Sequence, residues 1–242
     1  MLSTSVRKAG TMSTTAVLSG CVVLVAIAGL LALRRWAMTW GMTRKELSRS
    51  WPGDDLSPSP MEISTRGITI GAPMRAVWMW LVQIGQDRAG FYSYTWLENL
   101  FRCAMPRVER IVPEWQDRIL GDNVWLARPD RYRGNARQRV VRIVPGETMT
   151  LASPADWGNL IRRDANRDGT WTFVLVPVDE KTTRLIVRSR GPAGPSLPKR
   201  LFWLAAFDPA HFIMERRMMR RLKALAEADR PTWRNSVRWE CR

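Results

Sequence analysis

One long apolar segment lies near the start of the chain. Residues 16–33 read AVLSGCVVLVAIAGLLAL and contain no charged side chain. A helix rises 1.5 Å per residue, so these roughly 18 residues span about 27 Å, just enough to cross the hydrocarbon core of a bilayer. Arg7 and Lys8 would also suit a secretory signal peptide, but the run is longer than a signal core and no small-residue cleavage motif follows it. We therefore expect residues 1–35 to form a short tail and a retained transmembrane helix.

The charges that flank this segment predict its orientation. Arg7 and Lys8 lie upstream, whereas the downstream side carries more positive charge, at Arg34, Arg35, Arg44, Lys45 and Arg49. Cytoplasmic flanks carry the excess of Lys and Arg in membrane proteins. The pattern predicts a single-pass membrane protein with its C-terminal domain in the cytoplasm.

Residues 36–60 have a mixed pattern. Trp36, Trp40, Leu47 and Trp51 fall on one narrow face of a helix, which favours an amphipathic helix lying in the membrane interface. The alternative is that these tryptophans pack against the following domain. The proline-rich residues 52–60 then predict a turn-forming linker.

From residue 61 onward the pattern of residues predicts several strands, with helices near the start of this region and at its end. Gly and Pro clusters bound the strands, and Asp208 and Pro209 look like the start of a last helix that runs to Ala228. The expected strands are 63–70, 123–127, 139–144, 148–153, 169–178 and 182–190, with helices from Pro73 to Gly85 and from 93 to 101. This order predicts an α+β domain at 61–228, in which a curved antiparallel sheet grips a long C-terminal helix around a cavity. A basic tail at 229–242 has no periodicity.

Charge and cysteine content exclude several classes of function. The net charge is +16, but the basic residues are mostly arginines that are scattered along the chain and do not line one helix. A nucleic-acid-binding protein would gather them on one face, so we expect no nucleic-acid partner. The three cysteines form no CxxC pair, which gives no sign of a zinc site or a disulfide framework. We expect no metal and no cofactor.

Several segments resemble a known family. Residues 68–73 (ITIGAP) and 77–85 (VWMWLVQIG) resemble the opening of the SRPBCC (START/Bet v 1-like) superfamily. Residues 90–99 and 110–116 look like a bacterial membrane-anchored subgroup described as polyketide cyclase/dehydrase-like. Later segments that fit are 183–190 and 211–215, so the resemblance covers about 61–228. It implies the helix-grip fold and a hydrophobic cavity, but the superfamily includes lipid carriers, plant ligand binders, aromatase/cyclases and co-chaperones, so it implies no single reaction.

Aromatic residues are the first candidates for the cavity. Tyr92, Tyr94 and Trp96 are predicted at its mouth, where rings supply apolar area and a tyrosine hydroxyl can orient a ligand. Trp115 and Trp171 are the other aromatic candidates. Ordinary core packing is the alternative for each of these rings.

Charged residues form the second group of candidates. Glu98, His211 and Glu215 are the plausible acid and base groups, and the last two share one face of the final helix. Two such groups without a third do not make a metal site. Arg188 lies on the same side of its strand as Arg190, where it can pair with an acidic group of the ligand or with Glu215.

Three functions remain open at this point. The first is a membrane-anchored domain that binds a hydrophobic or amphipathic small molecule, lipid-like or polyketide-like, without catalysis. The second is a cyclase/dehydrase-like enzyme that uses Glu98, His211 or a tyrosine to move a proton. The third is a membrane-tethered module for protein interaction, whose partner the sequence does not indicate.

Overall fold

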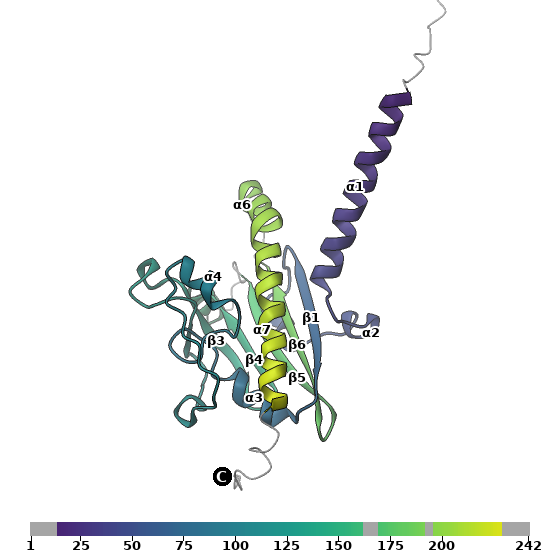
Figure 1. Cartoon of the computed structure of the whole chain (residues 1–242). Helices are drawn as coiled ribbons and strands as arrows, with labels where there is room; N and C mark the ends of the chain where they lie inside the picture. The colour runs from purple at the N-terminus through teal and green to yellow at the C-terminus, as the bar shows by residue number, and fades with distance from the viewer. Residues whose placement is uncertain (1–13, 162–168, 192–195, 229–242) are drawn as a thin grey trace, which may run out of the picture. The chain divides into compact units, whose positions relative to one another are not determined.

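The computed structural model describes residues 14–161, 169–191 and 196–228 (Figure 1). The chain forms two compact units, residues 1–37 and residues 38–242. The tail at 229–242, expected from the sequence, lies outside the described residues.

The first unit is dominated by helix α1 (Thr14–Met38). Residues Leu18–Met38 form a helical stretch that is long and apolar enough to cross a membrane, and only 6% of it is buried. The expected single membrane span is consistent with the length and composition of this helix.

The second unit is built on six antiparallel strands in the order β1-β6-β5-β4-β3-β2. Their bounds are Ile63–Ile70 for β1, Asn123–Trp125 for β2, Arg137–Val144 for β3, Thr148–Ala152 for β4, Thr170–Asp179 for β5 and Thr182–Arg190 for β6. Strands β2 to β6 are neighbours in the order of the sequence. Strand β1 pairs with β6 and forms the other edge of the sheet. The strands predicted from the sequence are confirmed, with small differences in their ends.

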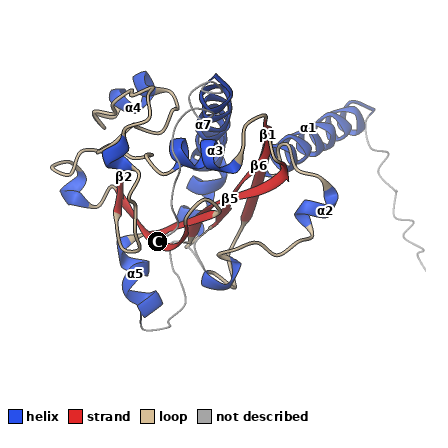
Figure 2. Ribbon diagram, turned by 90° about the horizontal axis from the view of Figure 1, so that it is seen from below, coloured by secondary structure: helices blue, strands red, loops and turns tan. Residues whose placement is uncertain are grey.

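Two helices cover one face of this sheet, which we call the inner face. They are α3 (Met74–Leu81) and the long α7 (Asp208–Ala228), which Figure 2 shows on the same side of the sheet. Leu81 and Leu222 are fully buried between the helices and strand residues such as Leu185 and Val187. Burial of this apolar face is the main source of stability of the domain, and the α+β helix-grip arrangement expected from the sequence is confirmed.

The other helices are short. They are α2 (Arg44–Leu47), α4 (Thr95–Leu100), α5 (Pro154–Ile161) and α6 (Leu197–Phe202), with single turns at η1 (Asp54–Leu56), η2 (Pro113–Trp115) and η3 (Tyr132–Gly134). The pattern predicted α4 but gave no sign of α5 or α6.

The last helix begins earlier than the sequence indicates. Helix α6 continues through a π-helical turn, η4 (Trp203–Phe207), directly into α7. Asp208 is the first residue of α7, as predicted, but it has ordinary helical angles (φ −59°, ψ −46°), so the expectation that it caps a free helix end is wrong. Pro209 has no N–H and its ring crowds the preceding turn, and a π-helical turn is one way in which a helix accommodates this interruption.

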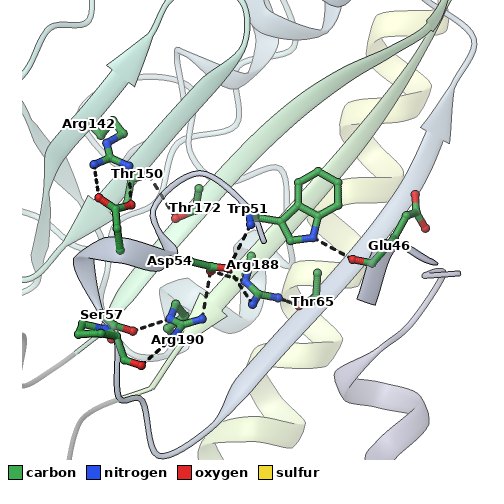
Figure 3. Close-up of polar contacts among 12 residues, drawn as sticks. Glu46, Trp51, Asp54, Ser57, Thr65, Arg142, Thr150, Thr172, Arg188 and Arg190 are labelled. Carbon is green, nitrogen blue, oxygen red and sulfur yellow. Dashed lines mark hydrogen bonds and ion pairs between the residues drawn. The ribbon is translucent and has the colours of Figure 1, made fainter. Parts of the chain in front are cut away.

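Residues 43–58 form a strap across the outer face of the sheet, the face opposite α7 (Figure 3). Trp51 is 5% exposed and packs on Val174 and Ile186. The carboxylate of Asp54 binds Arg188 (Nε to Oδ1, 2.6 Å), and Arg190 donates from Nε to the carbonyl of Ser57 at 2.6 Å.

This strap corrects two expectations. Residues 36–51 do not form one amphipathic helix, because α1 ends at Met38 and Gly41 has a φ of +73°. Trp40 and Trp51 follow the alternative and pack on the domain. Residues 52–60 are not a free linker either, because the aspartates of η1 bind arginines on the sheet.

Candidate functional site

A cavity of about 490 Å³ lies between the inner face of the sheet, α4 and the α6–α7 helix. Most of its wall is apolar, with rings, methionines and a cysteine, and a few charged groups interrupt it. The aromatic part of the lining is Phe91, Phe101, Trp171, Trp203 and Phe207. The size falls in the range of sites that hold drug-sized or lipid-like molecules.

Five rings form a continuous series along this wall. Phe91 stacks on Trp171 with 5.9 Å between ring centroids, and Trp171 meets His211 edge to face, also at 5.9 Å. His211 stacks on Phe207 at 5.3 Å, and Phe207 packs on Trp203 at 4.0 Å. The series joins the loop after α3, strand β5 and the final helix, so it gives the cavity one rigid aromatic side.

Glu215 ties the helix to the sheet beside these rings. Its side chain is buried, and Oε1 accepts a hydrogen bond from Trp171 Nε1 at 2.8 Å. Its Oε2 forms a buried ion pair with Arg66 of β1. The Nε2 atom of His211 lies 3.6 Å from Oε1. The carboxylate and the guanidinium neutralise each other, so this part of the wall carries no net charge when His211 is neutral.

His211 is held in its neutral form by its surroundings. Burial lowers the pKa of His211, although the nearby Glu215 carboxylate favours the protonated ring. A neutral imidazole at physiological pH can accept or donate one proton. It is therefore suited to hydrogen bonding with a ligand, or to acid and base chemistry.

Glu98 of α4 is different from the other charged groups of the cavity. It is 6% exposed, it lines the cavity, and its Oε2 has no hydrogen-bond partner within the described part of the chain. Burial raises the pKa of Glu98 to about 7. The neighbouring Cys103 has a raised pKa as well, because of its burial and because of Glu98. A carboxyl group at the midpoint of its titration near pH 7 is unusual for a merely structural residue.

Small side chains leave the space that the cavity occupies. Ser64 of β1 and Ser189 of β6 lie opposite each other in the sheet register, and both line the cavity. The buried Oγ of Ser189 has no hydrogen-bond partner among the described residues. Larger residues at these two neighbouring positions would project from the inner face into the cavity.

Four of the nine site residues expected from the sequence meet in this cavity: Glu98, Trp171, His211 and Glu215. They come from α4, β5 and α7, which are far apart in the sequence. The acid and base groups expected from the sequence thus share one site.

Tyr92 lies in the core and does not line this cavity. Its hydroxyl accepts a hydrogen bond from Gln83 Nε2 at 2.9 Å and donates to the carbonyl of Trp80 at 3.1 Å. Burial raises the pKa of Tyr92 well above its usual range. Tyr92 is therefore a core residue, which was the alternative to its predicted place at the cavity mouth.

Tyr94 and Trp96 lie outside the main cavity and line a smaller pocket, whose wall on the α7 side is formed by Arg217 and Arg221. Trp96 is 69% exposed, and the guanidinium of Arg217 lies 5.5 Å above the ring of Tyr94. Trp115 is in η2 and packs against the edge of the core. Its carbonyl accepts a hydrogen bond from Arg88 at 2.7 Å.

Arg188 projects from the outer face of the sheet. It pairs with Asp54 of the strap and donates to Thr65 Oγ1 at 2.6 Å. The sequence correctly places Arg188 and Arg190 on one side of the strand, but both guanidinium groups bind Asp54 and not Glu215. Arg190 is among the residues that line the cavity, whereas Arg188 is not. Arg66, one strand away, is the partner of Glu215.

Sequence reasoning missed Phe91, Phe101, Trp203 and Phe207. A signal was present for two of them, because residues 203, 207, 211 and 215 recur every four positions and so fall along one side of a helix. The assumed helix start at Asp208 hid this pattern. Within residues 14–161, 169–191 and 196–228, no group of three or more His, Cys, Asp or Glu side chains is placed to hold a metal ion.

Comparisons with known proteins give distant likenesses. No family model matches the chain, and no curated protein matches it. Similar solved structures include a Polyketide_cyc-like protein from Corynebacterium glutamicum, at 14% identity and a TM-score of 0.34, which covers 74% of this chain and 97% of its own. A self-sacrificing resistance protein from Micromonospora echinospora is 8% identical, with a TM-score of 0.41 and coverage of 69% and 95%. A protein from Bacillus halodurans is 14% identical, with a TM-score of 0.39 and coverage of 70% and 99%.

Proposed function

We propose that this protein is a single-pass membrane protein whose C-terminal domain binds a hydrophobic or amphipathic small molecule, lipid-like or polyketide-like, in the cavity beneath α7. The observation that carries the proposal is the 490 Å³ cavity with its continuous series of aromatic rings. Binding sites of this class are mostly apolar with a few polar groups that orient the ligand. Glu98 and His211 are those groups here.

The cavity opening supports uptake of an apolar molecule. Phe101 and Phe207 line the cavity and are also 62% and 36% exposed. Phe202 of α6, just before η4, is 61% exposed. Apolar surface of this kind marks ligand entrances and membrane-contacting surfaces. Met38, the first residue of the second unit, also lines the cavity. We infer that the ligand is one that partitions into the bilayer.

Labelled methionine methyl groups test this proposal. Met105, Met214 and Met218 line the cavity, whereas Met149 and Met219 are packed in the core. The full chain in lipid nanodiscs is titrated with dodecanol, and the methyl resonances are followed by NMR. We expect the first three to shift in a saturable way and the last two to shift little. Equal small shifts of all five would count against a ligand cavity.

Membrane attachment and orientation have a separate test. The basic flank after residues 16–33 predicts a cytoplasmic domain. A tag at the C-terminus should resist protease in intact cells and be digested in inverted membrane vesicles. The opposite pattern would reverse the orientation, and recovery of the chain in the soluble fraction would remove the anchor from the proposal.

A cyclase/dehydrase-like enzyme is a second candidate function. It is favoured by two ionisable groups in the same cavity, Glu98 with its pKa of about 7 and His211, whose pKa is lowered by burial. Loss of turnover in Glu98→Gln or His211→Gln, with ligand binding retained, would favour the enzyme.

A further inference from the structure

The cavity contains one acidic group, Glu98, with a carboxylate oxygen that no described residue satisfies. Arg66 and Glu215 neutralise each other, and the guanidinium of Arg190 turns to Asp54 and Ser57 on the outer face. Glu62 and Asp208 also line the cavity and have interactions of their own. The carboxyl group of Glu98 has a buried oxygen with no partner among the described residues.

An unpaired carboxyl group in an apolar wall is costly unless a ligand satisfies it. Burial of a polar group without a hydrogen bond costs on the order of 1–3 kcal/mol. Glu98 is 6% exposed and faces a space large enough for a ligand. The protein would lose little by replacing it with an apolar residue, so the group points to a ligand that supplies the missing partner.

We propose that Glu98 makes the cavity selective for amphipathic molecules that carry a protonated amine at the end bound beside α4. This inference rests on the proposed ligand-binding function and names the chemical class of the ligand. An ammonium group would form a charge-assisted hydrogen bond with the carboxylate. The apolar remainder of the molecule would lie along the series of rings.

The surroundings of Glu98 also favour a cation over an anion. Five aromatic rings line the cavity, and ring faces attract cations. The positive charge of Arg66 is neutralised by Glu215, so it does not repel an ammonium group. A fatty-acid carboxylate would instead face Glu98, and the described arginines that line the cavity, Arg66 and Arg190, are already paired with carboxylates. This internal preference is opposite to the net charge of the chain, which is +16.

Three probes of equal chain length test the proposal: dodecylamine, dodecanol and dodecanoic acid. Each is titrated into the full chain in nanodiscs at about pH 8, where Glu98 and the acid are ionised and the amine is protonated. The shifts of the methyl groups of Met105, Met214 and Met218 report occupancy. Each affinity is referred to the concentration of the probe in the lipid, measured in nanodiscs without the protein, so that differences in partition between the three probes cancel.

We expect the amine to bind at least about tenfold more tightly than the alcohol, with the acid weakest. Glu98→Gln should reduce the amine-to-alcohol ratio about tenfold. Glu109→Gln, which removes the same charge from an exposed ion pair with Arg107 and Arg221, should leave the ratio unchanged. Glu98→Leu provides a second variant of Glu98 if the glutamine variant folds poorly.

Each result decides between the two proposals. Equal binding of the amine and the alcohol, or an unchanged ratio in both Glu98 variants, overturns the selectivity and leaves the ligand cavity intact. Tighter binding of the acid overturns the selectivity as well. Failure of all three probes to shift the cavity methionines overturns the proposed function itself, and the selectivity with it.

Discussion

The indole Nε1 of Trp171 donates a hydrogen bond to Oε1 of Glu215 at 2.8 Å, which connects strand β5 to helix α7 at the cavity wall. The other carboxylate oxygen of Glu215 pairs with Arg66 on β1. One buried side chain therefore holds the helix against two strands of the sheet. It also fixes the ring of Trp171, which stands in the middle of the aromatic series.

Removal of one partner of the buried ion pair between Arg66 and Glu215 should destabilise the domain strongly. Glu215→Leu leaves the charge of Arg66 without its carboxylate, in a position that is 1% exposed, and should lower the free energy of unfolding by about 3–5 kcal/mol. The double variant Arg66→Met with Glu215→Leu should recover most of the loss, because both charges are gone. Denaturant unfolding followed by tryptophan fluorescence measures both variants. Trp171→Phe, which loses one hydrogen bond, should cost only about 1 kcal/mol.

Glu98 should make the stability of the domain fall as pH rises through neutrality. Folding raises the pKa of Glu98 from 4.5 to about 7, so the folded state binds this proton more tightly than the unfolded chain. The stabilisation is complete below pH 4.5 and is lost as pH rises through 7.

The comparison with Glu98→Gln isolates this effect, because His211 titrates in both proteins. Between about pH 4.5 and pH 8 the wild type should lose on the order of 1–3 kcal/mol relative to Glu98→Gln. Parallel stability curves for the two proteins over this interval would show that Glu98 titrates normally.

Two neighbouring aspartates of the strap should differ in their contribution to stability. Asp54 binds Arg188 and Arg190 (Figure 3). Its side chain is 19% exposed, whereas Asp55 binds Arg142 and is 62% exposed. Asp54→Asn should lower the free energy of unfolding by about 1.5–3 kcal/mol, and Asp55→Asn by less than about 1 kcal/mol, because water screens an exposed pair. Equal losses would mean that the strap is held by its aromatic contacts and not by Asp54.

Filling the cavity should separate ligand binding from stability. Ser189→Leu places an apolar side chain in the cavity and removes a hydroxyl that has no hydrogen-bond partner among the described residues. It should keep or raise the thermal midpoint and weaken dodecanol binding by at least about tenfold. Ser189→Ala removes the same hydroxyl without filling the space and should bind normally. Weak binding in both variants would mean that loss of the Ser189 hydroxyl, and not the filling of the cavity, weakens dodecanol binding.

The strands and the final helix could be predicted because their signals are local. Alternation in residues such as Leu185 and Val187, with turn residues at the strand ends, predicts the sheet without knowledge of its partners. The helical spacing of Met219 and Leu222 predicts the buried side of α7 in the same way. The end of β6 at Arg190 agrees with the pattern.

The site could be predicted only in part, because the face on which a residue lies depends on the whole sheet. Arg188 and Arg190 are of a residue type that is common in binding sites. The strap of residues 43–58 covers their face of the sheet, and Asp54 of the strap pairs with both. The start of the last helix was misjudged because Asp208 and Pro209 are typical of a helix beginning. A π-helical turn allows the helix to run through this point, and local sequence gives no direct signal for it.

Native mass spectrometry of the full chain tests the central claim most directly. The chain is extracted from its own membranes in lipid nanodiscs without detergent, so that detergent does not occupy the cavity. We predict that the wild type and Ser189→Ala carry one tightly held apolar molecule per chain, and that Ser189→Leu carries none. The same mass for wild type and Ser189→Leu, with no bound molecule in either or the same adduct in both, would contradict the claim that this cavity is a ligand site.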